Sequence, residues 1–297
     1  MKILLTGAQG QVGNEIQRRS AKLGLTVIPT SRETLDIGDK NQVSAIFEHE
    51  HFDLIINTAA YTAVDNAESN KEAAFQVNAV GVEHLARLAK LHAIPLFHVS
   101  TDYVFDGETT IAYQETAKTN PQTVYGASKL EGEQRLKETL AAHIILRTSW
   151  VFGIEGNNFV KTILRLGEEN DGLRVVADQL GNPTFAGSVA NALLCLAAQY
   201  SEKGDLKWGT YHFSDRGTTT WHSFAKQIIS CGHEHSLIKT LPIINPISTA
   251  DYPTPALRPC YSSLDTSLFF TTFPEIDIND WQDGLAHMIF TLSQEHG

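Results

Sequence analysis

Short apolar runs alternate with helix-length segments over the first half of the chain. Runs rich in Val, Ile and Leu lie at residues 2–6, 25–30, 53–58, 94–100 and 143–149. Continuous apolar runs are typical of parallel strands that helices cover on both faces, and their alternation with helical patterns indicates βαβ units. The pattern therefore predicts a doubly wound parallel α/β sheet over residues 1–150.

The second half of the chain has a different pattern. Helical patterns cover residues 158–169, 187–200, 219–230 and 278–294, and strand-like runs lie at 173–177 and 209–213. The segment 241–259 carries five prolines, so we expect an irregular loop that lines a surface cleft. Residues 151–297 are predicted to form a smaller C-terminal α/β substrate lobe that returns segments to the first domain.

The composition is that of an ordinary globular protein, with 42% hydrophobic and 19% charged residues among 297. The formal net charge is −11 and no basic run is present, so we expect neither nucleic acid nor an anionic membrane as a partner. The three cysteines are widely spaced, as is typical of reduced thiols. No apolar run has the length of a signal sequence or a membrane span, so we expect a soluble, cytoplasmic protein.

A glycine-rich loop follows the first predicted strand. Gly7, Gly10 and Gly13 form a GxxGxxG pattern that leads into an amphipathic helix. Glycines allow a tight turn and let the backbone approach a pyrophosphate, whose charge the helix N-terminus stabilises. A turn that only packs a helix on a strand has the same pattern, but its place after the first strand favours a Rossmann-type dinucleotide site.

The ends of the second and third predicted strands bear on the choice of cofactor. NAD-binding folds usually place Asp or Glu after the second strand, whereas this chain has Ser31 and Arg32. A hydroxyl and a guanidinium can bind a ribose 2′-phosphate, so we predict NADPH as the preferred cofactor, with NADH as the alternative. A solvated arginine is the other interpretation of Arg32. After the third strand comes the run Ala59, Ala60, Tyr61 and Thr62. Its small residues either let a cofactor lie across the edge of the sheet or only allow close packing.

Candidate catalytic residues follow the fourth predicted strand. Tyr125 and Lys129 are four residues apart, which places both on one face of a helix. An ammonium near the phenol lowers the tyrosine pKa, and such a tyrosine can donate a proton to a carbonyl oxygen as hydride reaches the carbon. Thr101, at the end of the fourth strand, could bind the same oxygen. The pair alone is common by chance, but its order after the glycine loop and Thr101 makes the combination specific.

With these motifs the chain resembles the extended short-chain dehydrogenase/reductases, and within them the branch that reduces dTDP-4-keto sugars. The matching strings span nearly the whole chain: GAQGQVG (7–13), NTAAYTAVDNAES (57–69), STDYVFDG (100–107), YGASKLEGE (125–133), LRTSWVFG (146–153), GNNFVKT (156–162), DQLGNPT (178–184), GTTTWHSFA (217–225) and YPTPALRP (252–259). The resemblance implies NADPH-dependent reduction of the C4 keto group of dTDP-4-dehydro-L-rhamnose to dTDP-L-rhamnose.

The resemblance also implies residue roles. Tyr125 would be the proton donor, Lys129 would hold the nicotinamide ribose and lower the tyrosine pKa, and Thr101 would orient the carbonyl. Cofactor contacts would come from Gly10, Gln11, Val12, Asp36, Ile37, Ala60, Tyr61 and Thr62. Substrate contacts would come from Thr101, Asp102, Tyr125, Trp150, Asn158, Gln179 and Arg258. For Arg258, a diphosphate contact and a structural salt bridge are equally open.

The sequence leaves more than one interpretation of metal binding, oligomeric state and function. Some members of the family bind magnesium between subunits through glutamates; Glu15 matches one such position but Gly187 occupies another, so no metal site is predicted and a homodimer is only a candidate. The run at 233–235, His-Glu-His, is interpreted as a solvated turn. The alternative functions are an NADP-binding regulatory subunit resembling the β-subunit of methionine adenosyltransferase, and another nucleotide-sugar reductase or epimerase of the extended type.

Overall fold

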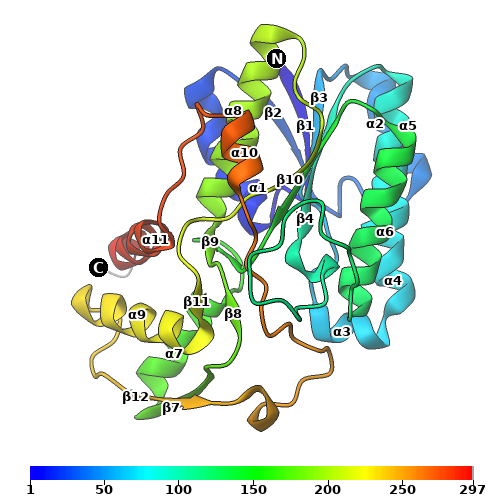
Figure 1. Ribbon diagram of the computed structural model, residues 1–297. Helices are drawn as coiled ribbons and strands as arrows, with labels where there is room; N and C mark the ends of the chain where they lie inside the picture. The colour runs from blue at the N-terminus through cyan, green and yellow to red at the C-terminus, as the bar shows by residue number, and fades with distance from the viewer. Residues whose placement is uncertain (296–297) are drawn as a thin grey trace.

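A parallel six-stranded sheet forms the centre of the computed structural model, which describes residues 1–295 (Figure 1). The strand order is β10-β5-β4-β3-β1-β2. The strands are β1 (Lys2–Thr6), β2 (Thr26–Thr30), β3 (Leu54–Asn57), β4 (Leu96–Thr101), β5 (His143–Thr148) and β10 (Gly209–His212). Because β2 and β3 flank β1 on opposite sides, the order reverses beside β1. The predicted doubly wound α/β fold is confirmed.

Helices cover both faces of this sheet (Figure 1). One face carries α1 (Gln11–Ser20) and α8 (Ala186–Lys203), and the other carries α2 (Lys40–His49), α5 (Val82–Leu91) and α6 (Val124–Thr139). Two short helices, α3 (Val64–Ser69) and α4 (Lys71–Phe75), and a π-helical turn, Gln76–Gly81, lead into α5. Between these layers every residue of β3 and β5 is buried, which explains the hydrophobic runs in these strands.

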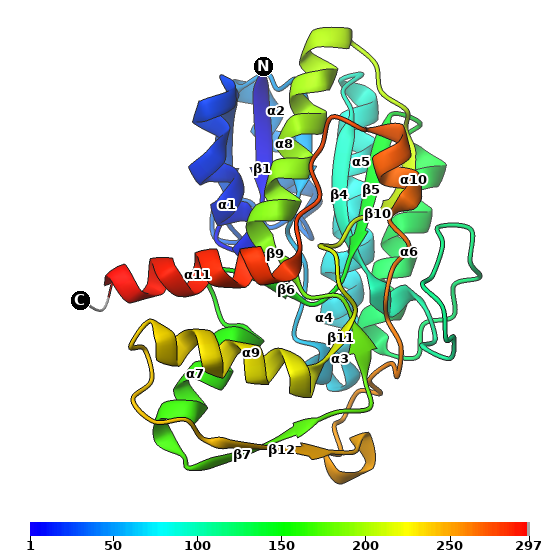
Figure 2. The same cartoon turned by 60° about the vertical axis from the view of Figure 1, so that its left-hand side comes forward.

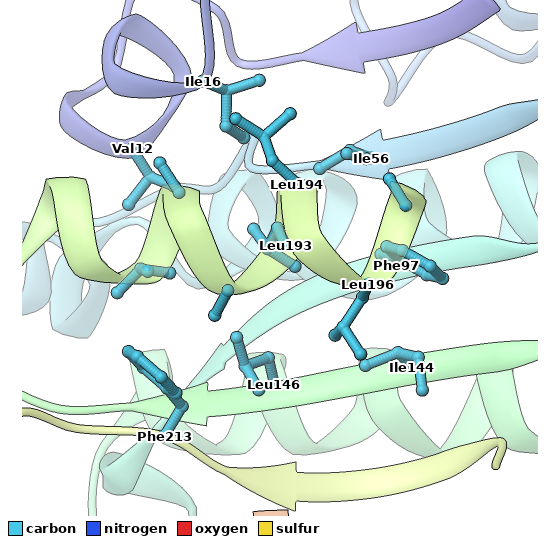
Figure 3. Close-up of a cluster of buried hydrophobic side chains, with 14 of the residues drawn as sticks. Val12, Ile16, Ile56, Phe97, Ile144, Leu146, Leu193, Leu194, Leu196 and Phe213 are labelled. Atoms are coloured by element: carbon cyan, nitrogen blue, oxygen red, sulfur yellow. The ribbon is translucent and has the colours of Figure 1, made fainter. Parts of the chain in front are cut away.

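The sheet face under α8 is the largest part of the core. Figure 3 shows Leu193, Leu194 and Leu196 of α8 among side chains of the sheet, with Val12 and Ile16 of α1 beside them. All five are buried. A helix from the second half of the chain therefore completes the packing of the first half.

The second lobe has its own core below the sheet (Figure 2). It contains α7 (Phe159–Glu169), α9 (Trp221–Glu234), α11 (Trp281–Glu295), and the strand pairs β7 (Gly172–Val176) with β12 (Ile243–Ile247), β6 (Val151–Phe152) with β9 (Thr184–Phe185), and β8 (Leu180–Gly181) with β11 (Thr219–Thr220). Three further elements of the second half belong to the first domain: β10 is a strand of the central sheet, and α8 and α10 (Ser267–Thr272) pack against the sheet. Within residues 1–295, no helix combines the length and apolar character that a membrane crossing requires.

Two local expectations were wrong. The proline-rich segment 241–259 is not wholly irregular, because it contains β12 and a short 3-10 turn, Thr249–Asp251. Its partner β7 is the only strand paired with β12 among the described residues, so Pro246 occupies an edge strand, where a missing N–H is tolerated. His233 and Glu234, expected in a turn, form the last turn of α9.

Candidate active site

A cleft of about 680 Å³ opens at the carboxyl edge of the central sheet. Ligands of open α/β sheets bind at this edge, where the strand order reverses. Most of the predicted site residues line this cleft: Gly7, Gly10, Gln11, Val12, Gly13, Ser31, Arg32, Asp36, Ile37, Ala59, Ala60, Tyr61, Thr62, Thr101, Asp102, Tyr125, Lys129 and Trp150. The structure therefore brings the glycine loop and the catalytic candidates to one place.

The glycine loop forms one wall of the cleft, where its chain must pass close to its neighbours. Gly7 has φ +73°, and a Cβ there would lie 2.5 Å from the backbone nitrogen of Ala59. A Cβ on Gly13 would lie 2.3 Å from the carbonyl oxygen of Gly7. No side chain of the described residues caps the N-terminus of α1, so the amides of its first turn are available to an anion. The loop thus fits the pyrophosphate of a dinucleotide.

The start of α6 positions Tyr125 in the cleft. The hydroxyl of Thr123 caps the helix by accepting a hydrogen bond from the backbone of Gly126 at 3.0 Å. A Cβ on Gly126 would lie 2.1 Å from the carbonyl oxygen of Tyr103, so glycine allows the close approach of α6 to the end of β4. The half-buried Tyr125 ring meets the Tyr103 ring edge-on, with centroids 5.5 Å apart.

The electrostatics of this pair differ from the expectation. Burial raises the pKa of Tyr125, and a hydrogen bond with Thr101 only partly offsets this effect. Lys129 is buried, and its Nζ donates to the carbonyl of Val99 at 2.7 Å. Burial also lowers the pKa of Lys129 to about 8. The predicted lowering of the tyrosine pKa by Lys129 is therefore wrong for the chain by itself, because the amine turns toward β4.

Asp102 brings a buried carboxylate to the same cleft. It is 3% exposed, and its Oδ1 accepts a hydrogen bond from the Thr101 hydroxyl at 3.0 Å. Burial raises the pKa of Asp102 to about 6, although hydrogen bonds from Ser262 and Thr101 act in the opposite direction. A carboxylate that is poorly solvated here is suited to accept hydrogen bonds from ligand hydroxyl groups.

The raised pKa of Asp102 implies a cost in stability at neutral pH. Because the pKa is about 6 in the fold against 3.8 for the free group, the free energy of unfolding falls as pH rises through this range. Asp102→Asn is expected to raise the free energy of unfolding at neutral pH by up to about 3 kcal/mol. The gain should vanish below about pH 4, where the carboxyl is protonated in both the folded and the unfolded wild type.

Urea unfolding at neutral and acidic pH measures this effect. Asp106→Asn is a control of opposite sign, because a hydrogen bond from Tyr113 lowers the pKa of Asp106 and its carboxylate is favoured in the fold. That variant should gain no stability at neutral pH. Equal stability of wild type and Asp102→Asn at neutral pH would contradict the argument.

Trp150 is another aromatic side chain that lines the cleft. Its backbone has φ +47°, an unusual conformation for a bulky residue, and its indole stacks on Trp221 with centroids 3.5 Å apart. A Cβ on Gly181 would lie 2.4 Å from the indole, so the ring needs glycine beneath it. Its Nε1 donates to the Ser262 hydroxyl at 3.2 Å. Trp221 was missed as a supporting residue, although it lies in the GTTTWHSFA string.

Three predicted substrate residues do not line the cleft. Asn158 caps α7 and donates to Gln11 Oε1 at 3.0 Å. Gln179 donates to the Thr249 hydroxyl at 3.0 Å. For Arg258 the alternatives were a diphosphate contact and a structural salt bridge, and the structure shows a salt bridge, with 2.6 Å between its Nη2 and Asp65 Oδ2. Asn158 and Arg258 thus join the second lobe to the first, whereas the Gln179 contact lies within the second lobe. The substrate contacts of all three stay predictions.

The residues around Glu15 do not fit a magnesium ion. Glu15 is buried, and its Oε2 accepts a hydrogen bond from Arg19 Nε at 2.9 Å, with Arg18 on its other oxygen. A Cβ on Gly187 would lie 2.5 Å from Arg19 Nη2, so a guanidinium fills the space beside the carboxylate. Within residues 1–295 no group of three or more His, Cys, Asp or Glu side chains is arranged to hold a metal ion.

Comparisons with known proteins agree with the motifs. The family model described as RmlD substrate binding domain matches residues 1–294. A dTDP-4-dehydrorhamnose reductase of Aggregatibacter actinomycetemcomitans is 42% identical over 97% of this chain and 98% of its own length. The structure of such a reductase from Clostridium acetobutylicum has a TM-score of 0.90 and 37% identity, covering 98% of this chain and 99% of that one. Another from Bacillus anthracis, solved in complex with NADP, has a TM-score of 0.89 and 34% identity, with coverage of 98% and 99%. The chain belongs to the dTDP-4-dehydrorhamnose reductase family, a branch of the extended short-chain dehydrogenase/reductases.

Proposed function

We propose that the protein catalyses the NADPH-dependent reduction of the C4 keto group of dTDP-4-dehydro-L-rhamnose, which gives dTDP-L-rhamnose. The observation that carries the proposal is one cleft that contains the dinucleotide loop together with Thr101, Tyr125 and Lys129. The names of the reductases in this family supply the substrate. The NADP complex of the Bacillus anthracis relative supports the choice of cofactor.

Each group has a role in this proposal. NADPH supplies the hydride that reaches C4 of the sugar. Tyr125 donates a proton to the C4 oxygen, and its raised pKa keeps the hydroxyl protonated at neutral pH. The Thr101 hydroxyl orients the same oxygen, and Lys129 binds ribose hydroxyls of the cofactor. Asp102 and Trp150 line the cleft beyond them and contact the sugar nucleotide.

The test is an assay of purified protein with NADPH and dTDP-4-dehydro-L-rhamnose, with loss of NADPH absorbance and product identification as readouts. Stoichiometric NADPH oxidation with formation of dTDP-L-rhamnose is the expected result. An epimerase would interconvert sugars without net consumption of NADPH. A regulatory subunit would bind NADPH but show no turnover alone. Either outcome would overturn the proposal.

Cofactor preference depends on Arg32. Its side chain is 85% exposed at the rim of the cleft, and its Nε lies 3.7 Å from Asp36 Oδ2. A guanidinium that is free to turn can bind a 2′-phosphate with charge-assisted hydrogen bonds. Arg32→Ala is expected to lower kcat/KM for NADPH roughly tenfold, which is the loss of one such bond, and to leave that for NADH unchanged.

The measurement is kcat/KM with each cofactor in wild type and variant. Arg87→Ala is a matched control, because Arg87 also forms an exposed i, i+4 ion pair, with Glu83, but lies outside the cleft. It should change neither value. An Arg32→Ala enzyme with wild-type kcat/KM for NADPH would exclude the phosphate contact.

Cytoplasmic location and a homodimer are further parts of the proposal. All three cysteines are free in the described chain, which suits a reducing compartment where NADPH is supplied. Sedimentation of the purified protein tests the homodimer, and cell fractionation tests the location.

A further inference from the structure

A chain of buried polar side chains runs behind the catalytic cleft, from the first strand to Lys129. It consists of Thr6 on β1, Asn57 on β3, His98 on β4 and Lys129 on α6, and each is at most 2% exposed. Neither Asn57 nor His98 was predicted as a site residue. Buried polar groups in contact constrain one another, since each must match donor to acceptor.

The amide of Asn57 has one orientation. The backbone N–H of Ala59 donates to Asn57 Oδ1 at 3.0 Å, and the Thr6 hydroxyl donates to the same oxygen at 2.6 Å. A backbone N–H can only donate, so the atom facing Ala59 must be the oxygen. Asn57 Nδ2 therefore faces His98 Nδ1, at 2.9 Å.

This orientation fixes the tautomer of His98. An amide nitrogen only donates, so Nδ1 accepts and the proton of the neutral imidazole lies on Nε2. Burial lowers the pKa of His98 well below its usual value, which favours the neutral ring. The Nε2 atom lies 3.2 Å from Lys129 Nζ. A neutral amine has a lone pair to accept this N–H, whereas an ammonium has none.

We propose that Asn57 locks His98 as the Nε2–H tautomer, and that His98 thereby presents a donor to Lys129 Nζ and favours the neutral amine of Lys129. His98 and Asn57 are positioning residues that set the proton affinity of a catalytic lysine. The neutral amine keeps its donation to the Val99 carbonyl and has one further N–H to offer. The lowered pKa of Lys129 agrees in direction.

The other charged groups around these buried polar side chains do not take the role of His98 as a donor to Lys129 Nζ. Glu133, one turn after Lys129 on α6, raises the pKa of Lys129 but is engaged by Arg147 of β5. His143 of β5 acts on His98, lowering its pKa. Tyr125 precedes Lys129 by one turn of α6. The His98 imidazole differs from these groups because it lies within hydrogen-bond distance of Lys129 Nζ, and its tautomer decides whether it donates or accepts there.

The consequence for catalysis rests on the proposed reductase function, but the tautomer does not. Where the pH dependence of kcat/KM reflects the titration of Lys129, the pH at which kcat/KM changes is set by His98 and Asn57, which lie outside the cleft. This pH should move with substitutions at His98 and Asn57 by the same amount as the lysine pKa.

Two variants of the full-length protein test the proposal by NMR. The pKa of Lys129 is followed in protein with isotope-labelled lysine, and its signal is assigned by its loss in Lys129→Arg. His98→Phe removes the donor and adds no charge, so the pKa of Lys129 should rise by about one unit or more. His143→Phe removes a buried histidine that bonds to the Leu140 carbonyl instead, and it should leave the Lys129 pKa unchanged.

Asn57→Asp keeps the oxygen facing Ala59 and replaces the amide nitrogen by an acceptor. His98 should then move its proton to Nδ1, which the imidazole nitrogen shifts report, and its Nε2 should accept from the ammonium. The added charge alone could raise the lysine pKa, so the tautomer is the decisive readout for this variant. A fallen or unchanged Lys129 pKa in His98→Phe, or an Nδ1–H tautomer in wild type, would overturn the proposal. Neither readout requires turnover, so a failed activity assay would count against the reductase function alone.

Discussion

Tyr125→Phe is expected to lower kcat by about 10²- to 10⁴-fold while NADPH still binds with the wild-type Kd. The substitution removes only the hydroxyl that would donate the proton to the C4 oxygen. The phenyl ring keeps its edge-on contact with Tyr103 and its place at the start of α6. The loss should therefore appear in kcat rather than in cofactor binding.

A second tyrosine of the cleft provides the control. Tyr103→Phe also removes a hydroxyl beside the site, but that hydroxyl accepts a hydrogen bond from Arg258 at 3.2 Å. This variant should lose far less kcat than Tyr125→Phe. Steady-state kinetics and fluorescence titration with NADPH make the comparison. Wild-type kcat in Tyr125→Phe would exclude the proton-donor role.

The largest effect on stability is expected at a buried ion pair next to the site. Arg147 of β5 binds Glu133 of α6 through two hydrogen bonds, of 2.8 and 2.6 Å, and the Ser100 hydroxyl donates to the same carboxylate. Both charged side chains are almost fully buried. Arg147→Met would remove the bidentate partner of the buried Glu133 and leave it only the Ser100 hydroxyl and the longer, half-exposed contact with Lys137 at 3.5 Å. Breaking a buried pair in this way typically costs about 3–5 kcal/mol of unfolding free energy.

The double variant Arg147→Met, Glu133→Leu should recover much of this loss, because neither charge of the buried pair is left. Arg165→Met is the control at an exposed pair, with Glu169, and should cost less than about 1 kcal/mol. Urea unfolding measures all three. Arg147 lowers the pKa of Glu133 below 4.5, the usual value of a free glutamate. The pair therefore stabilises the fold fully above pH 4.5, and this stabilisation is lost as the pH falls through the lowered pKa. A single variant as stable as wild type would contradict the argument.

The central sheet and the location of the cleft could be predicted because both depend on chain order. Parallel strands covered on both faces need continuous apolar runs, and their carboxyl ends meet at one edge. Gly7 follows β1, Thr101 ends β4 and the helix that carries Tyr125 comes after β4, so their convergence follows from the topology. The outlying β12 was missed because a proline-rich run gives no indication that it will lie at a sheet edge.

Contacts between distant segments could not be predicted in the same way. Arg258 and Asp65 are far apart in the sequence, and neither residue type nor local spacing indicates that they pair. The i, i+4 spacing places Tyr125 and Lys129 on one face but does not reveal that the Lys129 amine turns toward His98. Burial, which dominates the pKa of both catalytic groups, is a property of the assembled layers.

The position of α8 has a consequence for folding during synthesis. Five of the six strands of the central sheet are complete at residue 148, whereas α8, which covers one face of the sheet, ends at Lys203 and the sixth strand, β10, ends at His212. Until about sixty further residues leave the ribosome, apolar side chains such as Phe97, Ile144 and Leu146 lack the cover that α8 provides. The nascent first half therefore passes through an aggregation-prone stage, and its completion is a post-translational or late co-translational event that depends on the second half.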